Sequence, residues 1–305
     1  MNRNRFITKL FLTLIALVGL STSAFAETPA AARARADIQS TLGFVPDFLQ
    51  KTPETLLPGM WEELKTLQLN PRTALDGRTK ELIGLAVAAQ IPCRYCIVAH
   101  TEFAKLNGAS EAEIGEAVGM AAVTRHWSTF LNGAQIDEAR FRADVAKLID
   151  NAKRAAASKA PAPASVDVVD GASAVREMNA LLGFAPEFLQ KFPAVARSGA
   201  WKQMRDLQLN PKTALSGKQK ELIGLAVSAQ IPCRYCVVAH TEFAKLNGAT
   251  EAEIGEALAM AAVTRSVSTV LNGLQIDEAR FRRDTDRLVR GAKAAKAAKG
   301  PVAQR

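Results

Sequence analysis

Apolar residues recur at helical spacing along most of the chain, and no stretch of strand length alternates between apolar and polar positions. Residues 56–69 show this spacing and end at the helix-stop signal Asn70-Pro71. The following segment, from the potential cap Asp76 to about Gln90, is apolar on nearly every side, which indicates a buried helix. The pattern predicts an all-α fold.

Start and stop signals place three more helices. Pro92 suits the first turn of a helix that stops at Asn107-Gly108. Ser110 and Glu113 form a capping box that opens the next helix. A last helix is expected over about 134–152.

Nearly the whole pattern occurs twice, at an offset of 140 residues. The identical segments include 81–87 with 221–227, 91–96 with 231–236, and 100–108 with 240–248. A period this long indicates a duplicated domain rather than a solenoid repeat. We expect two tandem helical domains at 27–152 and 171–291, an Ala/Pro linker at 153–170, and a basic tail at 292–305.

Residues 1–26 resemble an export signal. Basic residues precede a short apolar run at 11–20, and Ala24-Phe25-Ala26 fits a small-x-small cleavage site. The run is shorter than the ~20 residues of a membrane-spanning helix, so we favour a cleaved signal peptide over a retained anchor. The mature chain is then expected to start near Glu27 and to be periplasmic.

The formal net charge of +9 would suit a protein that binds nucleic acid or an anionic membrane. Removal of residues 1–26 leaves 36 Lys and Arg against 30 Asp and Glu, a net charge of +6. Much of the remaining excess lies in the linker and tail, and the chain has no recognition motif or aromatic platform for nucleic acid. We therefore expect solvated basic extensions and no nucleic-acid partner.

The four cysteines form one C-x-x-C pair in each copy, and a histidine follows each pair by four residues. On a helix, Cys93, Cys96 and His100 lie along one face, as do Cys233, Cys236 and His240. The positive end of the helix dipole favours the thiolate, so one cysteine can attack while the other closes a disulfide. The histidine can exchange a proton with the second cysteine or stabilise its anion.

A glutamate precedes each cysteine pair by twelve residues: Glu81 in the first copy and Glu221 in the second. Such a carboxylate could orient the histidine or accept its proton through a water. It could equally do no more than complement the dipole of its own helix. The sequence leaves these two interpretations open.

The cysteine pairs are also compatible with other kinds of site. A structural disulfide suits an oxidising compartment, and a zinc site would need ligands from both copies. Covalent haem requires C-x-x-C-H, whereas three residues intervene here before the histidine. A thioredoxin fold would require strands around the motif. We favour redox-active thiols with no cofactor or metal.

The arrangement of Glu81, Cys93-x-x-Cys96-x-x-x-His100, an Asn-Gly stop and a capped helix resembles the alkylhydroperoxidase D (AhpD) core within the carboxymuconolactone decarboxylase-like superfamily. The resemblance covers nearly all of both copies. It implies an all-helical fold and reduction of hydroperoxides by the cysteine pair. It also implies that Cys96 and Cys236 attack the peroxide, that Cys93 and Cys233 resolve, and that Glu81–His100 and Glu221–His240 relay protons.

The sequence departs from AhpD at one position. AhpD has a histidine just before its second cysteine, where this chain has Tyr95 and Tyr235. A phenol carries protons less well than an imidazole at neutral pH, so the tyrosines are candidates for packing or hydrogen bonding at the site. Phe103 and Phe243 are further candidates for lining the site and shielding it from water.

The expected partners are a hydroperoxide substrate, an unidentified dithiol electron donor and further copies of the chain, with a trimer favoured. Three alternatives are kept: thiol–disulfide exchange or redox sensing without peroxidase activity, a carboxymuconolactone decarboxylase-like enzyme, and a binding module with structural disulfides. The decarboxylases of the superfamily do not need this cysteine pair, which makes thiol chemistry the better interpretation.

Overall fold

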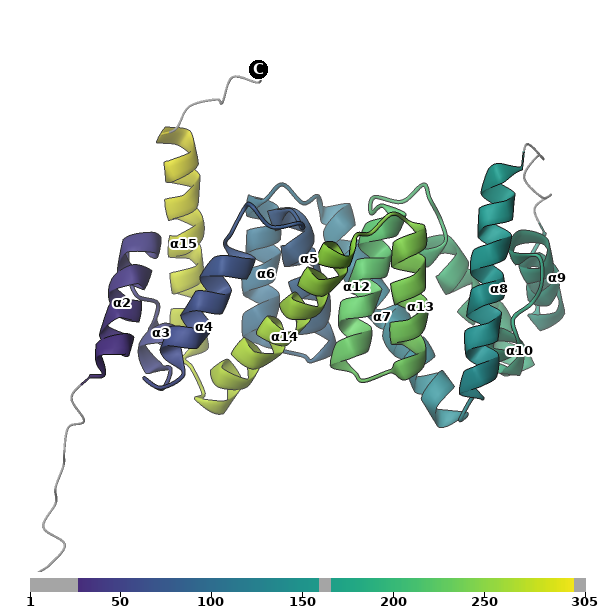
Figure 1. Cartoon of the computed structure of the whole chain (residues 1–305), viewed down its shortest axis with the longest axis horizontal. Coiled ribbons are helices and arrows are strands. Elements are labelled where there is room, and N and C mark those ends of the chain that lie inside the picture. Colours follow the sequence, from purple (N-terminus) through teal and green to yellow (C-terminus); the bar gives the residue numbers. More distant parts are fainter. Residues whose placement is uncertain (1–26, 159–165, 299–305) are drawn as a thin grey trace, which may run out of the picture.

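The computed structural model describes residues 27–158 and 166–298, and every regular element within them is a helix (Figure 1). The all-α prediction is therefore confirmed. The expected signal peptide, the middle of the linker and the end of the basic tail lie outside the described residues.

The two repeats contain the same series of helices. The first comprises α2 (Pro29–Leu42), α3 (Asp47–Lys51), α4 (Leu57–Glu63), the π-helical η1 (Leu64–Gln68), α5 (Gly77–Gln90), α6 (Arg94–Leu106), α7 (Glu111–Gly133) and α8 (Glu138–Ala157). The second comprises α9 (Gly171–Leu182), α10 (Glu187–Lys191), α11 (Ala194–Gln203), the π-helical η2 (Met204–Gln208), α12 (Gly217–Gln230), α13 (Arg234–Leu246), α14 (Glu251–Gly273) and α15 (Glu278–Ala298).

Several helix ends follow the signals in the sequence. The Asp76 carboxylate accepts a hydrogen bond from the Thr79 amide at 2.8 Å and caps α5, which ends at Gln90 as predicted. Ser110 and Glu113 form the expected capping box of α7. Helix α6 ends just before the Asn-Gly pair, where Gly108 takes a left-handed φ of +87° that suits a residue without a side chain.

Other boundaries differ from the predictions. Pro92 lies in the turn before α6 rather than in its first turn, because Cys93 is the N-cap. The helix expected over 56–69 ends in a π-helical turn. Helix α8 starts after the cap Asp137 and continues to Ala157, into the segment expected to be a linker.

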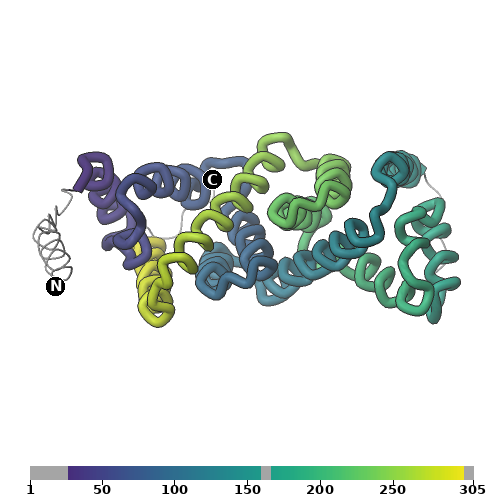
Figure 2. Tube along the Cα trace, turned by 90° about the horizontal axis from the view of Figure 1, so that it is seen from below, coloured from purple at the N-terminus to yellow at the C-terminus, as the bar shows by residue number. Residues whose placement is uncertain are grey.

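The repeats exchange their last helices and together form an elongated molecule (Figure 1; Figure 2). Helix α15 of the second repeat packs against α3 and α6 of the first. Reciprocally, α8 of the first repeat packs against α10 and α13 of the second. Two units follow one another in sequence, but each is completed in space by helices of the other.

The centre of the molecule is one apolar core shared by both repeats. Helices α5, α7, α12 and α14 contribute buried Leu, Ile, Val, Ala and Met side chains to it. The Glu256 carboxylate accepts hydrogen bonds from the amides of Ala74 and Leu75 at 2.7 Å, and Glu116 accepts the corresponding bonds from Ala214 and Leu215. These charge-assisted bonds fix the position of each repeat's loop against the other repeat.

One helix in the described part of the chain, α14, has the length and apolar composition of a membrane-spanning helix. Its small and apolar side chains, including Ala257, Met260 and Ala261, are buried in the shared core. Packing between the repeats accounts for its apolar character.

Candidate functional site

The first cysteine pair lies at the amino-terminal end of α6. Cys93 is the N-cap, and its Sγ accepts a hydrogen bond from the Cys96 amide at 3.3 Å. Cys96 lies in the first turn and His100 one turn further along, and both side chains are buried. The helix therefore directs an amide donor and its positive dipole end at the Cys93 sulfur, an arrangement that stabilises a thiolate.

His100 is held by a carboxylate from the neighbouring helix. Its Nδ1 lies 2.7 Å from Glu81 Oε2, and both side chains are buried. With Glu81 ionised, Nδ1–H donates to the carboxylate and Nε2 is left to exchange a proton. Of the two interpretations left open by the sequence, the geometry favours the one in which Glu81 orients the histidine.

Gln68 holds the other side of the carboxylate. Its Nε2 donates to Glu81 Oε1 at 3.0 Å from the π-helical turn η1. The turn and the loop that follows it are anchored by the fully buried Lys80, whose Nζ donates to the carbonyls of Leu67 in the turn and Asn70 in the loop. Lys80 thereby places Gln68 against Glu81, and the carboxylate is fixed from two directions.

The second repeat completes the first site through α14. Thr264 Oγ1 lies 3.4 Å from His100 Nε2, and Asn272 Nδ2 lies 3.6 Å from Cys93 Sγ. The Asn272 amide also donates to the Ser268 carbonyl at 2.8 Å, which fixes its orientation. Two polar groups that face the reactive side chains thus come from the other copy of the sequence.

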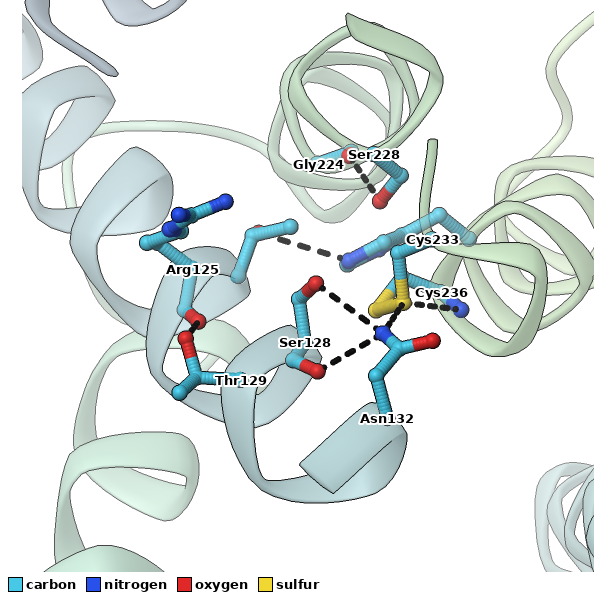
Figure 3. The surroundings of a disulfide bond; sticks show 10 residues. Arg125, Ser128, Thr129, Asn132, Gly224, Ser228, Cys233 and Cys236 are labelled. Carbon is cyan, nitrogen blue, oxygen red and sulfur yellow. Dashed lines mark hydrogen bonds between the residues drawn. A yellow bond between two sulfur atoms is a disulfide. The ribbon is translucent and has the colours of Figure 1, made fainter. Parts of the chain in front are cut away.

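The second site repeats this geometry, with α7 of the first repeat facing the cysteines (Figure 3). His240 Nδ1 lies 2.7 Å from Glu221 Oε2, and Asn132 Nδ2 lies 3.6 Å from Cys233 Sγ. Cys233 and Cys236 form a disulfide here, whereas Cys93 and Cys96 are free thiols. The hydrogen bond from the second amide to the first sulfur is 3.2 Å in the disulfide and 3.3 Å in the dithiol. The start of the helix is therefore alike at the two sites.

The two cysteines of the reduced pair have pKa values that are shifted in opposite directions. The pKa of Cys93 is lowered to about 6, mainly because the Cys96 thiol donates a hydrogen bond to its sulfur. Burial opposes this effect, and smaller contributions in the same direction come from Ser268, the Cys96 amide and Asn272. The pKa of Cys96 is raised, because its proton is held by Cys93 and because it is buried. Cys93 is thus the thiolate of the reduced pair.

Of the two cysteines, Cys96 is the one that lines a cavity. Cys96 and His100 line a cavity of about 110 Å³ together with Phe103, whereas Cys93 is 0% exposed and does not line it. Cys236, His240 and Phe243 line the corresponding cavity of the second site. The thiolate and the sulfur that lines the cavity are different members of the pair.

The two tyrosines lie beside the cysteines but do not line these cavities. Tyr95 donates its hydroxyl to the Ile276 carbonyl at 2.7 Å, and Tyr235 donates to the Ile136 carbonyl at 2.6 Å. The Tyr95 ring packs edge-on against Phe281. Each tyrosine therefore joins one repeat to the other. Of the aromatic candidates, Phe103 and Phe243 are the ones that line the cavities.

Asn272→Ala is expected to raise the pKa of Cys93 above its value of about 6, because the substitution removes a donor to the thiolate. The measurement is the pH dependence of iodoacetamide alkylation, followed by mass spectrometry of the peptide that contains Cys93. Ala88 and Ser228 distinguish this peptide from its counterpart in the second repeat. Asn132→Ala is the matched control and should leave the pH dependence of Cys93 alkylation unchanged. An unaltered Cys93 profile in Asn272→Ala would show that the cross-repeat contact does not stabilise the thiolate.

Sequence reasoning missed the polar residues that surround the cysteines and the Glu–His pair. They are Gln68, Thr264, Ser268 and Asn272 in the first site and Gln208, Thr124, Ser128 and Asn132 in the second. All of them recur at the offset of 140 residues. Polar identity between the copies at buried helical positions was the signal that could have found them.

The geometry does not support the zinc interpretation. Within residues 27–158 and 166–298, no group of three or more His, Cys, Asp and Glu side chains is arranged to hold a metal ion. At the first site, the histidine lies next to Thr264, whereas Cys93 lies next to Asn272.

The profile of the carboxymuconolactone decarboxylase family matches residues 56–139 and 198–279, so the chain belongs to this family and carries two tandem copies of its domain. Members of the family are enzymes of decarboxylase or peroxidase type.

Two individual proteins are similar to the chain. The "Uncharacterized protein 4 in cox locus" of Paracoccus denitrificans is 46% identical over 52 residues, which is 17% of this chain and 47% of that protein. The chain thus spans about half the length of this curated relative. A crystal structure from Burkholderia xenovorans, provisionally described as a gamma-carboxymuconolactone decarboxylase subunit, aligns with a TM-score of 0.49 at 19% identity over 88% of this chain and 96% of that chain.

Proposed function

We propose that each site reduces a hydroperoxide to an alcohol and water at the expense of its cysteine pair. The observation that carries the proposal is that Cys96 and His100 line one cavity while the Cys93 thiolate lies directly behind Cys96. A peroxide in the cavity would meet a sulfur nucleophile and a proton-exchanging imidazole together, with a second sulfur ready to close the disulfide.

The proposed reaction has two steps. Cys96 Sγ attacks the terminal peroxide oxygen and passes its proton to His100. The O–O bond breaks, the alcohol leaves with a proton from His100, and Cys96 becomes a sulfenic acid. The Cys93 thiolate then attacks the Cys96 sulfur, the S–S bond forms, and hydroxide leaves and is protonated to water. The two thiols together supply two electrons.

Turnover requires an external reductant. A dithiol donor would reduce the disulfide by exchange, and a mixed disulfide with the donor would be the intermediate. If the chain is exported, this donor is periplasmic. The expected trimer stays a prediction for a measurement of mass in solution.

The test is stopped-flow consumption of hydroperoxides by the pre-reduced chain, with thiols counted before and after. We expect peroxide loss to match loss of the two thiols in each pair. Cys96→Ser with Cys236→Ser should abolish the reaction, and the folded state of this variant is checked by circular dichroism. Peroxide consumption that persists in a folded Cys96→Ser/Cys236→Ser variant would refute the proposal.

Thiol–disulfide exchange is the second candidate, favoured by the lowered pKa of Cys93 at a helix N-cap. Burial argues against it, because Cys93 is 0% exposed and a protein disulfide could not reach its sulfur without local opening. Reduction of a protein disulfide by the reduced chain, with no consumption of peroxide, would favour this candidate over peroxide reduction.

A further inference from the structure

The two sites have cavities of very different size. The cavity at Cys96 and His100 measures about 110 Å³, whereas the one at Cys236 and His240 measures about 800 Å³. Pockets for drug-sized ligands span about 300–1,000 Å³, and a water molecule needs roughly 10–15 Å³ of comparable space. The first cavity therefore suits a molecule of a few heavy atoms, and the second suits a much larger one.

The larger cavity extends along the end of α8 and the end of α9, and it also extends along the loop at Asn210 and Pro211. Asn151, Ala152 and Arg154 of α8 line it together with Leu181 of α9 and Gly183, the C-cap of that helix. The positions on α15 that correspond to these α8 residues are Gly291, Ala292 and Ala294, and none of them lines the smaller cavity. The end of α8 thus lines the larger cavity, whereas the corresponding end of α15 does not line the smaller one.

Most of the wall of the large cavity is apolar, and the positively charged Arg154 lines it near the end of α8. Trp127, Phe141, Val145 and Phe188 line it together with Cys236 and Arg154. Arg154, which is exposed and donates a hydrogen bond to Asn151 Oδ1, lies thirteen residues after Phe141 on the same helix. That separation corresponds to roughly 20 Å along α8. The wall therefore suits a long apolar body with an anionic end.

We propose that the second site takes long-chain amphipathic hydroperoxides, such as those of fatty acids, with Arg154 near the carboxylate, and that the first site takes only small hydroperoxides. The inference rests on the proposed peroxide reduction for its chemistry. It adds that the two sites of one chain divide substrates by size. The apolar body would lie along Trp127, Phe141 and Val145, which places the peroxide group near Cys236 and His240.

Single-site variants separate the two activities. Cys93→Ser/Cys96→Ser leaves the second site, and Cys233→Ser/Cys236→Ser leaves the first. With linoleic acid hydroperoxide, we expect thiol oxidation in the second site to be faster by about tenfold or more. With hydrogen peroxide, the two sites should react at comparable rates. Equal preference of both sites for the two peroxides would overturn the division while leaving peroxide reduction intact.

Matched variants of the cavity wall test the same inference without touching the cysteines. Ala152→Trp should obstruct the α8 side of the large cavity and slow thiol oxidation by linoleic acid hydroperoxide by about tenfold. Ala292→Trp, at the corresponding exposed position of α15, should have no effect on either site. Arg154→Ala should slow thiol oxidation by linoleic acid hydroperoxide. The rate with cumene hydroperoxide, which has no carboxylate, should stay unchanged. Equal effects of the two tryptophan substitutions would contradict the assigned cavity.

Binding of oleate, which carries no peroxide group, distinguishes failure of the inference from failure of the proposed function. Calorimetry of the wild-type chain should show oleate binding that is lost in Ala152→Trp and retained in Ala292→Trp. If no peroxide oxidises either site but oleate binds in this way, peroxide reduction is wrong and the assignment of an amphipathic ligand stands. Absence of oleate binding to the wild-type chain would overturn that assignment.

Discussion

Glu81→Gln together with Glu221→Gln is expected to slow thiol oxidation by hydroperoxide about a hundredfold, the lower end of what general acid–base groups contribute. The carboxylates lie 2.7 Å from His100 and His240, where they fix the tautomer and balance the charge of a protonated ring. An uncharged amide of the same shape keeps the packing and loses this charge. The measurement is stopped-flow thiol oxidation from pH 5 to 9.

The pH profile separates a role in proton exchange from a structural one. Loss of the carboxylate should change the shape of the rate–pH curve as well as its height, because the variant removes the charged group that contacts the histidine. The control is Glu116→Gln, which alters a carboxylate that binds backbone amides far along α7 from the cysteines. A Glu81→Gln/Glu221→Gln variant with the wild-type profile would exclude Glu81 and Glu221 from the proton relay.

Gly84→Ala is expected to destabilise the fold by about 1–3 kcal/mol and to inactivate the first site. A Cβ at this position of α5 would lie 2.5 Å from His100 Nδ1, inside the space that the imidazole occupies. The ring would have to leave its place beside Glu81, since the backbone of the buried helix α5 cannot move aside easily. Chemical denaturation and thiol oxidation of the first site measure the two effects.

Gly115→Ala in α7 is the matched control, and its expected effect on fold stability has the opposite sign. No heavy atom lies within 4 Å of a Cβ built on Gly115, which sits inside a long helix. The substitution should stabilise the fold by about 0.5–1 kcal/mol through the lower chain entropy of alanine, and it should leave both sites active. Wild-type activity in Gly84→Ala would show that the histidine does not need its observed position.

The sequence predicted best the features that depend on local signals. The caps at Asp76 and Ser110 and the stop at Asn107-Gly108 involve residues a few positions apart, and the structure has all of them. Glu81 and His100 were proposed as a pair, and the packing of α5 against α6 brings them into contact.

The sequence could not predict features that depend on how distant helices pack. Asn272 and Cys93 are 179 residues apart, and no periodicity links them. Tyr95 was placed at the site because it lies between the cysteines, yet its hydroxyl reaches a carbonyl of the second repeat. The position of Cys93 as N-cap rather than inside the first turn also escaped prediction, because Pro92 is a good first-turn residue.

The exchange of helices between the repeats has a consequence for how such a site is assembled. A chain with one repeat would need a second copy to supply α14 and α15, so its sites would be lost on dilution. Fusion makes the pairing intramolecular and keeps the effective concentration of the partner high at any dilution. Two identical chains must also build identical sites, whereas a fused pair can diverge. The difference between about 110 Å³ and about 800 Å³ is a divergence of this kind.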